Sequence, residues 1–394
     1  MDAEITEVTY SYVEEDKLPQ NLIDSLKNCK TVSMDTEADS LHHYYDKVCL
    51  IQTNINGNIF IIDPLICKDL DTFFGLLKDK TLIFHGADYD IRILKRDFDF
   101  IPYKVFDTML ATQLLGYEKL GLIDLTEKHF GIKLSKGPQK MDWSIRPLPD
   151  NMLKYAVNDV RYLPQLYNIL VGELNESKRL EWLNETCRHL IETSVAEKET
   201  EDEDLWRIKG SYDLNRSELN YLKELWFWRE KEAGHVDLPV FRILKNDSLI
   251  TLAKWSVQEK PLSESPVYSL ISHWKNRLQR LERTISRASK IMRPLWPKIK
   301  RPAKGKRKDV DPHLFELLKQ KRDEIAGQLQ IDPAIILNHR SLTAVSAFNI
   351  CSERFINNGD PDLPHVHNWQ KELLWPSFEK IISNYKAGLT QNTH

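Results

Sequence analysis

The chain has 394 residues, of which 41% are hydrophobic, 29% charged and 10% aromatic, and its formal net charge is −3. These values suit two or three globular domains and exclude a largely disordered or fibrous chain. No apolar run approaches the about 18 residues of a membrane span, and the five cysteines form no Cys-x-x-Cys pair, which argues against a disulfide framework or a thiolate zinc site. Because the first residues also lack a basic and an apolar signal segment, a cytoplasmic protein is expected.

Strand and helix patterns alternate along the first half of the chain. The predicted strands cover residues 30–37, 48–53, 58–62, 81–85 and 105–106, and the predicted helices follow Asp90, cover 108–115 and cover 151–170. The second and third strands flank Asn54-Ile-Asn-Gly57, which is a strong signal for a hairpin turn. Three meandering strands followed by alternating helices and strands predict an α/β domain with a mixed sheet.

From Trp206 onward strand patterns almost disappear and helical patterns dominate. The charge changes with them: residues 1–190 carry a net −8, residues 191–205 a net −6 and residues 206–394 a net +11. An acidic front suggests a divalent-metal site and a basic rear a surface that holds anions, although charge can also differ between domains without functional meaning. The predicted boundaries are an α/β domain over 1–195, an acidic linker over 196–210, a helical domain over 211–292, a basic linker over 293–309 and a second helical domain over 310–394.

The basic linker contains seven basic residues and no acid between Lys298 and Lys308, with Pro302 and Gly305 among them. Proline and glycine disfavour a helix here. A solvated connector and a tether that contacts RNA are both compatible with this composition.

Acidic residues carry the candidate chemistry of the first half. Asp35 and Glu37 lie two residues apart on a predicted strand, so their side chains project from the same face. A largely apolar strand tolerates two carboxylates best when a cation lies between them. Asp90 begins the helix after the fourth strand, and Asp88 is its alternative, because one of the two can cap the helix while the other faces the site.

Tyr155 and Asp159 lie one turn apart on one face of a predicted helix. A phenol beside a metal-binding carboxylate can orient a water molecule. His85, at a strand end, is expected to be a hydrogen-bonded core histidine rather than a ligand. Because the candidate ligands are carboxylates, Mg²⁺ or Mn²⁺ is favoured over zinc, and the absence of a Gly-x-x-x-x-Gly-Lys-Ser/Thr loop argues against ATP-driven chemistry.

These residues stand in motifs that resemble the three exonuclease motifs of the DEDD superfamily, in its tyrosine-bearing branch. The motifs are Asp35-x-Glu37, Phe84-His-Gly-Ala-Asp-Tyr-Asp90 and Tyr155-x-x-x-Asp159. The segments between them, such as Asp142-Trp-Ser-Ile-Arg-Pro-Leu148, are similar to those of the bacterial ribonuclease D family, and the resemblance covers about residues 5–190. Further on, residues 225–253 resemble an HRDC domain, and residues 310–345 resemble the second, more divergent HRDC-like domain of that family.

The resemblance implies a ribonuclease H-like mixed sheet flanked by helices, followed by two all-α HRDC-type domains. It also implies a metal-dependent 3′→5′ exoribonuclease that trims structured RNA with a free 3′ end, tRNA precursors above all, and releases 5′-nucleoside monophosphates without an obligate protein partner. Tyr155 would position the attacking water in a site with two divalent cations, Mg²⁺ or Mn²⁺. The implied metal ligands are Asp35, Glu37, Asp90 and Asp159.

One segment departs from the family pattern. Lys136-Gly-Pro-Gln139 places a Gly-Pro dipeptide in a loop that usually contains Ser or Glu and that is expected to contact the substrate. Two other functions remain open at this point: a 3′→5′ exonuclease that acts on DNA, and a nucleic-acid-binding scaffold without catalysis. Digestion of matched DNA and RNA oligonucleotides, with EDTA as a control, distinguishes the three.

Overall fold

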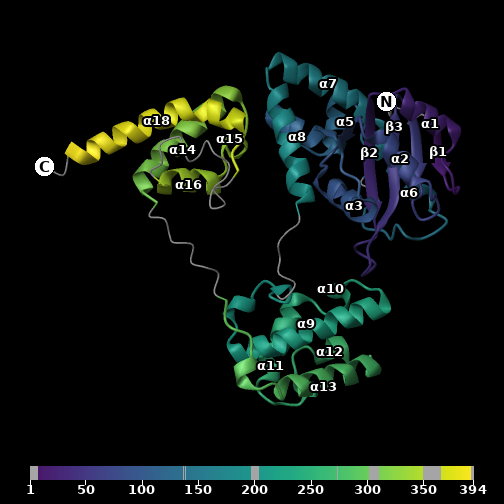
Figure 1. Ribbon diagram of the computed structural model, residues 1–394, viewed down its shortest axis with the longest axis vertical. Coiled ribbons are helices and arrows are strands. Elements are labelled where there is room, and N and C mark those ends of the chain that lie inside the picture. The colour runs from purple at the N-terminus through teal and green to yellow at the C-terminus, as the bar shows by residue number, and fades with distance from the viewer. Residues whose placement is uncertain are drawn as a thin grey trace. The chain divides into compact units, whose positions relative to one another are not determined.

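The computed structural model describes residues 8–135, 137, 139–196, 204–272, 274–300, 310–348 and 365–391 (Figure 1). The chain forms two compact units. The first comprises Met1–Ala38, Val48–Ala196 and Arg307–His394, and the second comprises Asp39–Lys47 and Glu197–Lys306. Residues 197–203 of the predicted acidic linker, residues 301–309 of the basic linker, and Lys136 and Pro138 lie outside the described residues. Over the residues described, no helix has both the length and the apolar character needed to cross a membrane.

A six-stranded sheet forms the centre of the first unit. Its order is β1-β4-β3-β2-β5-β6. Strand β3 pairs antiparallel with β2 and β4, whereas the other neighbours are parallel, so the predicted mixed sheet is confirmed. The strands are β1 (Tyr10–Val13), β2 (Thr31–Ala38), β3 (Val48–Ile55), β4 (Asn58–Ile62), β5 (Thr81–Phe84) and β6 (Lys104–Asp107).

The β3–β4 hairpin ties the sheet to the helix that carries two of the candidate site residues. Asn56 and Gly57 both adopt positive φ angles, of 51° and 93°, as a two-residue hairpin turn of this twist requires. The Asn54 side chain accepts a hydrogen bond from the Gly57 amide at 2.9 Å and donates to the carbonyls of Val160 and Arg161 at 3.2 and 3.1 Å. The C-terminal end of helix α6 is thereby held against the hairpin.

Helices flank this sheet, and α6 packs along β2, β3 and β4 (Figure 1). The single helix predicted over 151–170 is wrong in one respect, because the structure divides it at Tyr162. Pro164 lies in the first turn of the following helix, where its missing N–H is tolerated, but it cannot continue a preceding one. The helices are α1 (Gln20–Lys27), α2 (Leu70–Leu77), α3 (Asp88–Phe98), α4 (Thr108–Leu115), α5 (Leu122–Phe130), α6 (Asp150–Arg161), α7 (Leu163–Glu176) and α8 (Leu180–Val195).

The second unit is helical in its described residues and has its own core around Trp206, Leu225 and Leu281. Its longest helix begins with a capping box formed by Asn215 and Glu218. The helices are α9 (Arg216–Val236), α10 (Val240–Ile243), α11 (Asn246–Ser256), α12 (Tyr268–Ile271) and α13 (Lys275–Ser289).

The loop between β2 and β3 belongs to this second unit. Asp237, just after α9, accepts hydrogen bonds from the backbone amides of Tyr44 and Tyr45 at 3.0 and 3.1 Å. Its other oxygen lies 2.7 Å from Nδ1 of His43. The segment Asp39–Lys47 is therefore clamped to the helices of the second unit by both backbone and side-chain contacts.

The C-terminal helices pack around a third core and also contact α8 of the first unit. The rings of Trp182 on α8 and Trp369 stack with their centroids 4.6 Å apart, and Arg179 donates a hydrogen bond to the Leu329 carbonyl at 2.8 Å. These helices therefore belong to the same compact unit as the sheet. They are α14 (Pro312–Leu329), α15 (Pro333–Ile336), α16 (His339–Phe348) and α18 (Asn368–Gln391).

Three histidines meet at this contact. The rings of His189 on α8 and His365 stack 3.6 Å apart, and Nε2 of His365 lies 3.3 Å from Nδ1 of His367. Burial, the neighbouring histidines and Lys371 lower the pKa of His367 to about 4. The charge of Glu185 has a smaller, opposite effect. Burial also lowers the pKa of His365, so this contact favours the neutral forms of His365 and His367.

We expect protonation of His367 to destabilise the first unit. A histidine in the unfolded chain has a pKa near 6.5, whereas folded His367 has a pKa of about 4. Between these two pH values the unfolded chain binds a proton that the folded chain does not bind. The free energy of unfolding therefore falls as the pH falls from about 6.5 to about 4. Discounted for partial exposure, the loss is about 1–2 kcal/mol. Thermal unfolding at pH 7 and pH 5 should show a smaller drop for His367→Gln than for the parent. The exposed His235→Gln serves as the control, and an equal drop in all three proteins would contradict the expectation.

Candidate active site

One strand and one helix carry three of the candidate acids. Strand β2 carries Asp35 and Glu37 and is held on both sides by β3 and β5, which fixes its position. Helix α6 packs against β2 and carries Tyr155 and Asp159 one turn apart. As a result, carboxylate oxygens of Asp35, Glu37 and Asp159 all lie within 4.8 Å of one another. We call these three residues and Asp90 the acid cluster.

Asp90 reaches the cluster through a turn held by β6. The Asp107 side chain accepts hydrogen bonds from the amides of Gly86 and Ala87 at 3.0 and 2.8 Å, directly before α3 begins. Asp90, in the first turn of α3, is only 7% exposed and accepts a hydrogen bond from the Thr36 hydroxyl on β2. Thr36 stands between Asp35 and Glu37 in the chain, so Asp90 lies beside the same stretch of β2.

Asp88 points elsewhere. It forms an ion pair with Arg92 and accepts a hydrogen bond from the Ser194 hydroxyl of α8 at 2.9 Å. The idea that Asp88 or Asp90 caps α3 is wrong, since the N-cap residue is Ala87 and no side chain caps it. Asp107 from the neighbouring strand instead holds the turn before α3 through the amides of Gly86 and Ala87, an arrangement that local sequence does not reveal.

The acid cluster carries more negative charge than its surroundings compensate. Burial raises the pKa of Asp35 well above its usual range, and the charged neighbours that raise it further are all carboxylates, Asp90, Asp159 and Glu37. Burial and the charges of Asp159 and Asp90 raise the pKa of Glu37 to about 9. Burial raises the pKa of Asp159 to about 8, with a smaller contribution from Asp90, although the hydrogen bond from Tyr155 lowers it. Burial also raises the pKa of Asp90 to about 7. Without a counter-ion these groups favour their protonated forms.

A divalent cation fits this cluster. The Oδ2 atom of Asp159 is buried and has no hydrogen-bond partner among the described residues. Buried, mutually repelling carboxylates are costly unless a positive charge compensates them. Several carboxylate oxygens converging on one point are the ligand set of a hard cation such as Mg²⁺ or Mn²⁺.

Tyr155 lies at the edge of the cluster with its proton retained. Its hydroxyl donates a hydrogen bond to Asp159. Burial and the charges of Asp159 and Glu37 raise the pKa of the phenol, so it remains a hydrogen-bond donor at neutral pH. Gly137 lies so close to the ring that a Cβ there would overlap it, and the Gln139 side chain hydrogen-bonds to Tyr155.

These two contacts come from the loop that departs from the family pattern. The described members of that loop, Gly137 and Gln139, lie against Tyr155. Sequence reasoning missed this role, as it missed those of Thr36 and Asp107. The Gly-Pro dipeptide was the available signal, because a glycine is required where another side chain lies against the backbone.

His85 behaves as the sequence predicts. Its Nδ1 atom lies 2.9 Å from the Thr108 hydroxyl, which in turn donates to the Phe84 carbonyl at 2.9 Å. Burial lowers the pKa of His85, so it stays neutral. It is a hydrogen-bonded histidine of the interior, as expected.

Comparisons with known proteins agree with this geometry. Residues 10–175 match the family model of the 3′-5′ exonuclease domain, and residues 218–256 match that of the HRDC domain. A ribonuclease D of Bartonella henselae is 27% identical over 368 residues, which is 91% of this chain and 86% of that protein. A ribonuclease D of Shewanella sp. is 33% identical over 248 residues, 62% of this chain and 64% of that protein.

The fold has a solved counterpart. The crystal structure of Escherichia coli RNase D, described as an exoribonuclease involved in structured RNA processing, matches with a TM-score of 0.70 and 22% identity over 96% of this chain and 99% of that one. The α/β sheet and its acid cluster define a metal-dependent 3′–5′ exonuclease. The chain is similar to ribonuclease D proteins along most of its length, and its exonuclease domain is that of a metal-dependent 3′–5′ exoribonuclease.

Proposed function

We propose that this chain removes nucleotides one at a time from the 3′ end of structured RNA, with tRNA precursors as the expected substrate. The observation that carries the proposal is the convergence of Asp35, Glu37 and Asp159 within 4.8 Å, with Asp90 hydrogen-bonded to Thr36 beside them. The similarity of the chain to ribonuclease D proteins supports RNA as the substrate.

The acid cluster would hold two divalent cations, Mg²⁺ or Mn²⁺, through Asp35, Glu37, Asp90 and Asp159. When bound, such cations lower the pKa of a water molecule and neutralise charge on the phosphate and on the leaving 3′-oxygen. The chain itself keeps the acids in place: Thr36 fixes the carboxylate of Asp90, and the β2 ladder fixes Asp35 and Glu37. The Tyr155 phenol, which retains its proton, would orient the attacking water in line with the scissile bond.

The test is digestion of a labelled tRNA precursor with a 3′ extension, with the products resolved nucleotide by nucleotide. The proposal predicts a ladder shortened from the 3′ end in Mg²⁺ or Mn²⁺, and no products in EDTA. A matched DNA oligonucleotide should be degraded much more slowly. An intact precursor in both metals, or faster loss of the DNA, would refute the proposal.

Replacing Tyr155 by phenylalanine tests the assignment of the phenol. Phenylalanine keeps the ring that packs under Gly137 but removes the hydrogen bond to Asp159. We expect hydrolysis to slow by about a hundredfold, within the range for a positioned proton-handling group. Stabilisation of the protein by Mg²⁺ should persist, since no carboxylate is lost. Unchanged turnover would remove Tyr155 from the mechanism.

The C-terminal helices would form a second HRDC-like domain over residues 310–394, after an HRDC domain over 211–292. Both regions contain a long helix, a four-residue helix and a third helix, in α9–α10–α11 and in α14–α15–α16. Arg229 on α9 donates to the Leu244 carbonyl at 3.2 Å, and Arg322 on α14 donates to the Leu337 carbonyl at 2.9 Å. In both cases the acceptor lies 15 residues further along, at the end of the short helix. This repeated contact supports two copies of one module.

The expected compartment is the cytoplasm. Four cysteines are buried as free thiols, which suits a reducing environment. No obligate protein partner is proposed, because the acid cluster is assembled from one chain. The four cysteines are Cys29, Cys49, Cys67 and Cys187.

A further inference from the structure

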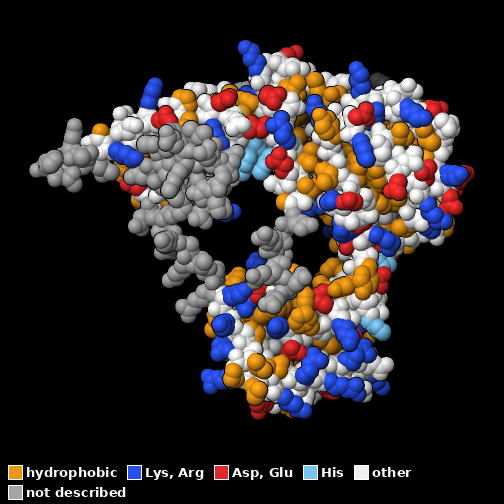
Figure 2. Space-filling view, in the orientation of Figure 1, with side chains coloured by type: hydrophobic (Ala, Val, Ile, Leu, Met, Phe, Trp, Pro, Cys, Tyr) orange, Lys and Arg blue, Asp and Glu red, His pale blue; other side chains and the backbone are white. Residues whose placement is uncertain are grey.

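The first unit contains a second group of metal-binding side chains in addition to the acid cluster. His189 lies on α8, and His365 and His367 lie in the segment just before α18. Figure 2 shows a group of histidine side chains on the surface, with acidic side chains beside it. We call these three residues the histidine cluster.

The segment before α18 holds two imidazoles close together. Val366 stands between them in the chain and is 1% exposed in the third core, so its neighbours point away from that core. The Nε2 atom of His365 and the Nδ1 atom of His367 lie 3.3 Å apart. This is longer than a typical hydrogen bond. It is close to the distance of about 3.3 Å between two nitrogens that each lie about 2.05 Å from one tetrahedral metal ion.

Helix α8 supplies the third imidazole and two carboxylates. Glu185, His189 and Glu192 are spaced by four and three residues, so they share one face of the helix. The ring of His189 stacks on that of His365 with the centroids 3.6 Å apart, and its Nδ1 atom lies 3.8 Å from a carboxylate oxygen of Glu192. The ring centroids of His189 and His367 are 5.4 Å apart. Three imidazoles and a carboxylate are thus brought together from segments that are far apart in the chain.

Glu185 has a different task, because both of its oxygens are already engaged. They accept hydrogen bonds from the backbone amides of Asn368 and Trp369, at 2.7 and 3.3 Å, at the start of α18. The side chain of Gln370 accepts a hydrogen bond from the amide of His367 at 2.7 Å. These contacts hold the backbone that carries the two histidines against α8, so the site is preorganised on this side.

The surroundings of His365 favour a cation. Burial, His189 and Lys371 lower the pKa of this imidazole, whereas Glu185 and Glu192 have the opposite effect. Two carboxylates therefore outnumber one ammonium group around the ring. Neutral imidazole is the form of histidine that binds a metal ion, and it is the form that burial favours here.

One adjustment is needed before all three imidazoles can bind the same ion. Among the described residues, only three members of the acid cluster have ligand atoms that all lie within 4.8 Å of one another. The ring of His189 faces that of His365 instead of directing a nitrogen to the same point, so the His189 side chain has to change its rotamer. This side chain is 28% exposed on the surface of α8, which leaves space for the change.

We propose that the histidine cluster binds a divalent transition-metal ion, Zn²⁺ above all, with its three imidazoles as ligands and Glu192 as the fourth. Imidazole and carboxylate groups are common ligands of tetrahedral zinc, whereas Mg²⁺ prefers all-oxygen sites such as the acid cluster. The ion would join α8 to the segment before α18 and would stabilise the first unit without taking part in hydrolysis. The proposal does not depend on the proposed function.

The experiment titrates Zn²⁺ into the untagged full-length chain near pH 7.5, with Mg²⁺ in excess to occupy the acid cluster. We expect one tightly bound Zn²⁺ per chain. His365→Ala/His367→Ala should bind it at least about a hundredfold more weakly, because loss of a ligand costs more than loss of an outer contact, which costs about 10–100-fold. Glu192→Gln should weaken binding by about tenfold.

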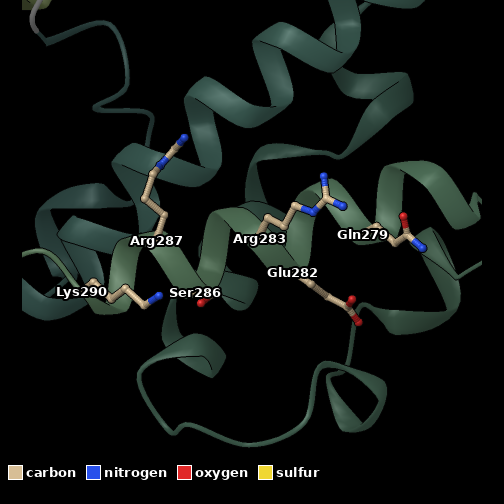
Figure 3. A pocket seen from close by; sticks show the side chains of 6 residues that line it. All are labelled: Gln279, Glu282, Arg283, Ser286, Arg287 and Lys290. Atoms are coloured by element: carbon tan, nitrogen blue, oxygen red, sulfur yellow. The ribbon is translucent and has the colours of Figure 1, made fainter.

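Exposed residues of the second unit provide matched controls. His235→Ala and Glu282→Gln remove the same kinds of side chain from positions outside the histidine cluster. Figure 3 shows Glu282 projecting from α13 on the side opposite to Arg283 and Arg287. Both control variants should bind Zn²⁺ as the parent does. Asp35→Asn, which changes the acid cluster, should also bind it as the parent does.

Two further measurements distinguish the histidine cluster from the acid cluster and from an effect of misfolding. Co²⁺ in a four-coordinate site with imidazole ligands absorbs visible light strongly, whereas Co²⁺ in an octahedral all-oxygen site absorbs weakly. Zn²⁺ added in excess Mg²⁺ should raise the Tm of the parent but not that of His365→Ala/His367→Ala, and the unfolding of this variant without zinc shows whether it folds. If it does not fold, His189→Gln on the surface of α8 replaces it and should bind Zn²⁺ at least about tenfold more weakly than the parent.

Three results would overturn the proposal. The first is a parent that binds no Zn²⁺ in excess Mg²⁺. The second is equal zinc affinity of the parent and of the folded histidine variant, which would place the ion elsewhere. The third is a weak Co²⁺ spectrum of the octahedral type.

Discussion

Substitution of Asp35 by asparagine is expected to reduce nucleotide release by roughly a thousandfold or more, while the chain still folds. Asparagine keeps the shape of the side chain but removes the charge at the centre of the acid cluster, where oxygens of Asp35, Glu37 and Asp159 lie within 4.8 Å of one another. The measurement is the release of 5′-nucleoside monophosphates from a 3′-labelled RNA at saturating Mg²⁺. Full activity would remove Asp35 from the site.

Asp88 and Asp90 provide a matched pair of controls in the first turn of one helix. Asp90→Asn should lose activity as Asp35→Asn does, because Asp90 is buried beside β2 and hydrogen-bonded by Thr36. Asp88→Asn should retain activity within about threefold, because Asp88 faces Ser194 and Arg92, and such partly exposed pairs contribute little. Equal losses in the two variants would mean that the orientation of α3 has been misassigned.

Mg²⁺ is expected to raise the thermal stability of the metal-free protein, and to do so more at pH 8 than at pH 5. Folding raises the pKa of Glu37 to about 9 and that of Asp159 to about 8, whereas unfolded carboxyl groups titrate near pH 4. The folded state therefore holds protons that the unfolded state has lost. The stability that this provides is complete below about pH 4 and is lost as the pH rises through the two folded values.

A bound cation reverses that loss because it stabilises the ionised acids in the folded state only. At a Mg²⁺ concentration a hundred times the dissociation constant, the free energy of unfolding increases by about 2.7 kcal/mol. For a unit of this size Tm rises by roughly 2–4 °C per kcal/mol, so we expect an increase of several degrees. Thermal unfolding of the parent and of Asp35→Asn, each with and without Mg²⁺, provides the test. The variant should be the more stable of the two without metal and should respond less to Mg²⁺ and to pH. Identical responses would contradict the assigned electrostatics.

The parts of the fold that sequence could predict are those in which local pattern and tertiary packing agree. Strands β2, β3 and β4 follow from apolar runs, and their hairpin follows from Asn56-Gly57, which adopts the positive φ angles that the turn requires. Strand β1 has only four residues and pairs at the edge of the sheet, so its pattern was too short to identify. The division between α6 and α7 was missed because the apolar stripe continues across Tyr162, although the helix itself is interrupted there.

In the candidate site, too, the residues that local patterns reveal differ from those that only long-range contacts reveal. Motif spacing identified Asp35, Glu37, Tyr155 and Asp159, because strand and helix periodicity place each pair on one face. The motif resemblance already favoured Asp90 over Asp88, but it gave no structural reason. That reason lies in Asp107, which holds the turn before α3 from another strand. Long-range hydrogen bonds of this kind leave no local periodicity, and neither does the contact of Gly137 with Tyr155.

The excursion of the chain at Asp39–Lys47 affects how the protein can be dissected. The polypeptide passes from the first unit to the second after Ala38 and returns to the first at Val48, so that nine residues belong to the second unit. It enters the second unit again after Ala196. The second unit is thus discontinuous, and a fragment that begins after Ala196 lacks the segment whose backbone and His43 satisfy Asp237. An excised helical module would lose the Tyr44 ring, which packs against its core, and the hydrogen bonds to Asp237, so grafting residues 39–47 onto such a fragment should improve its cooperativity of unfolding.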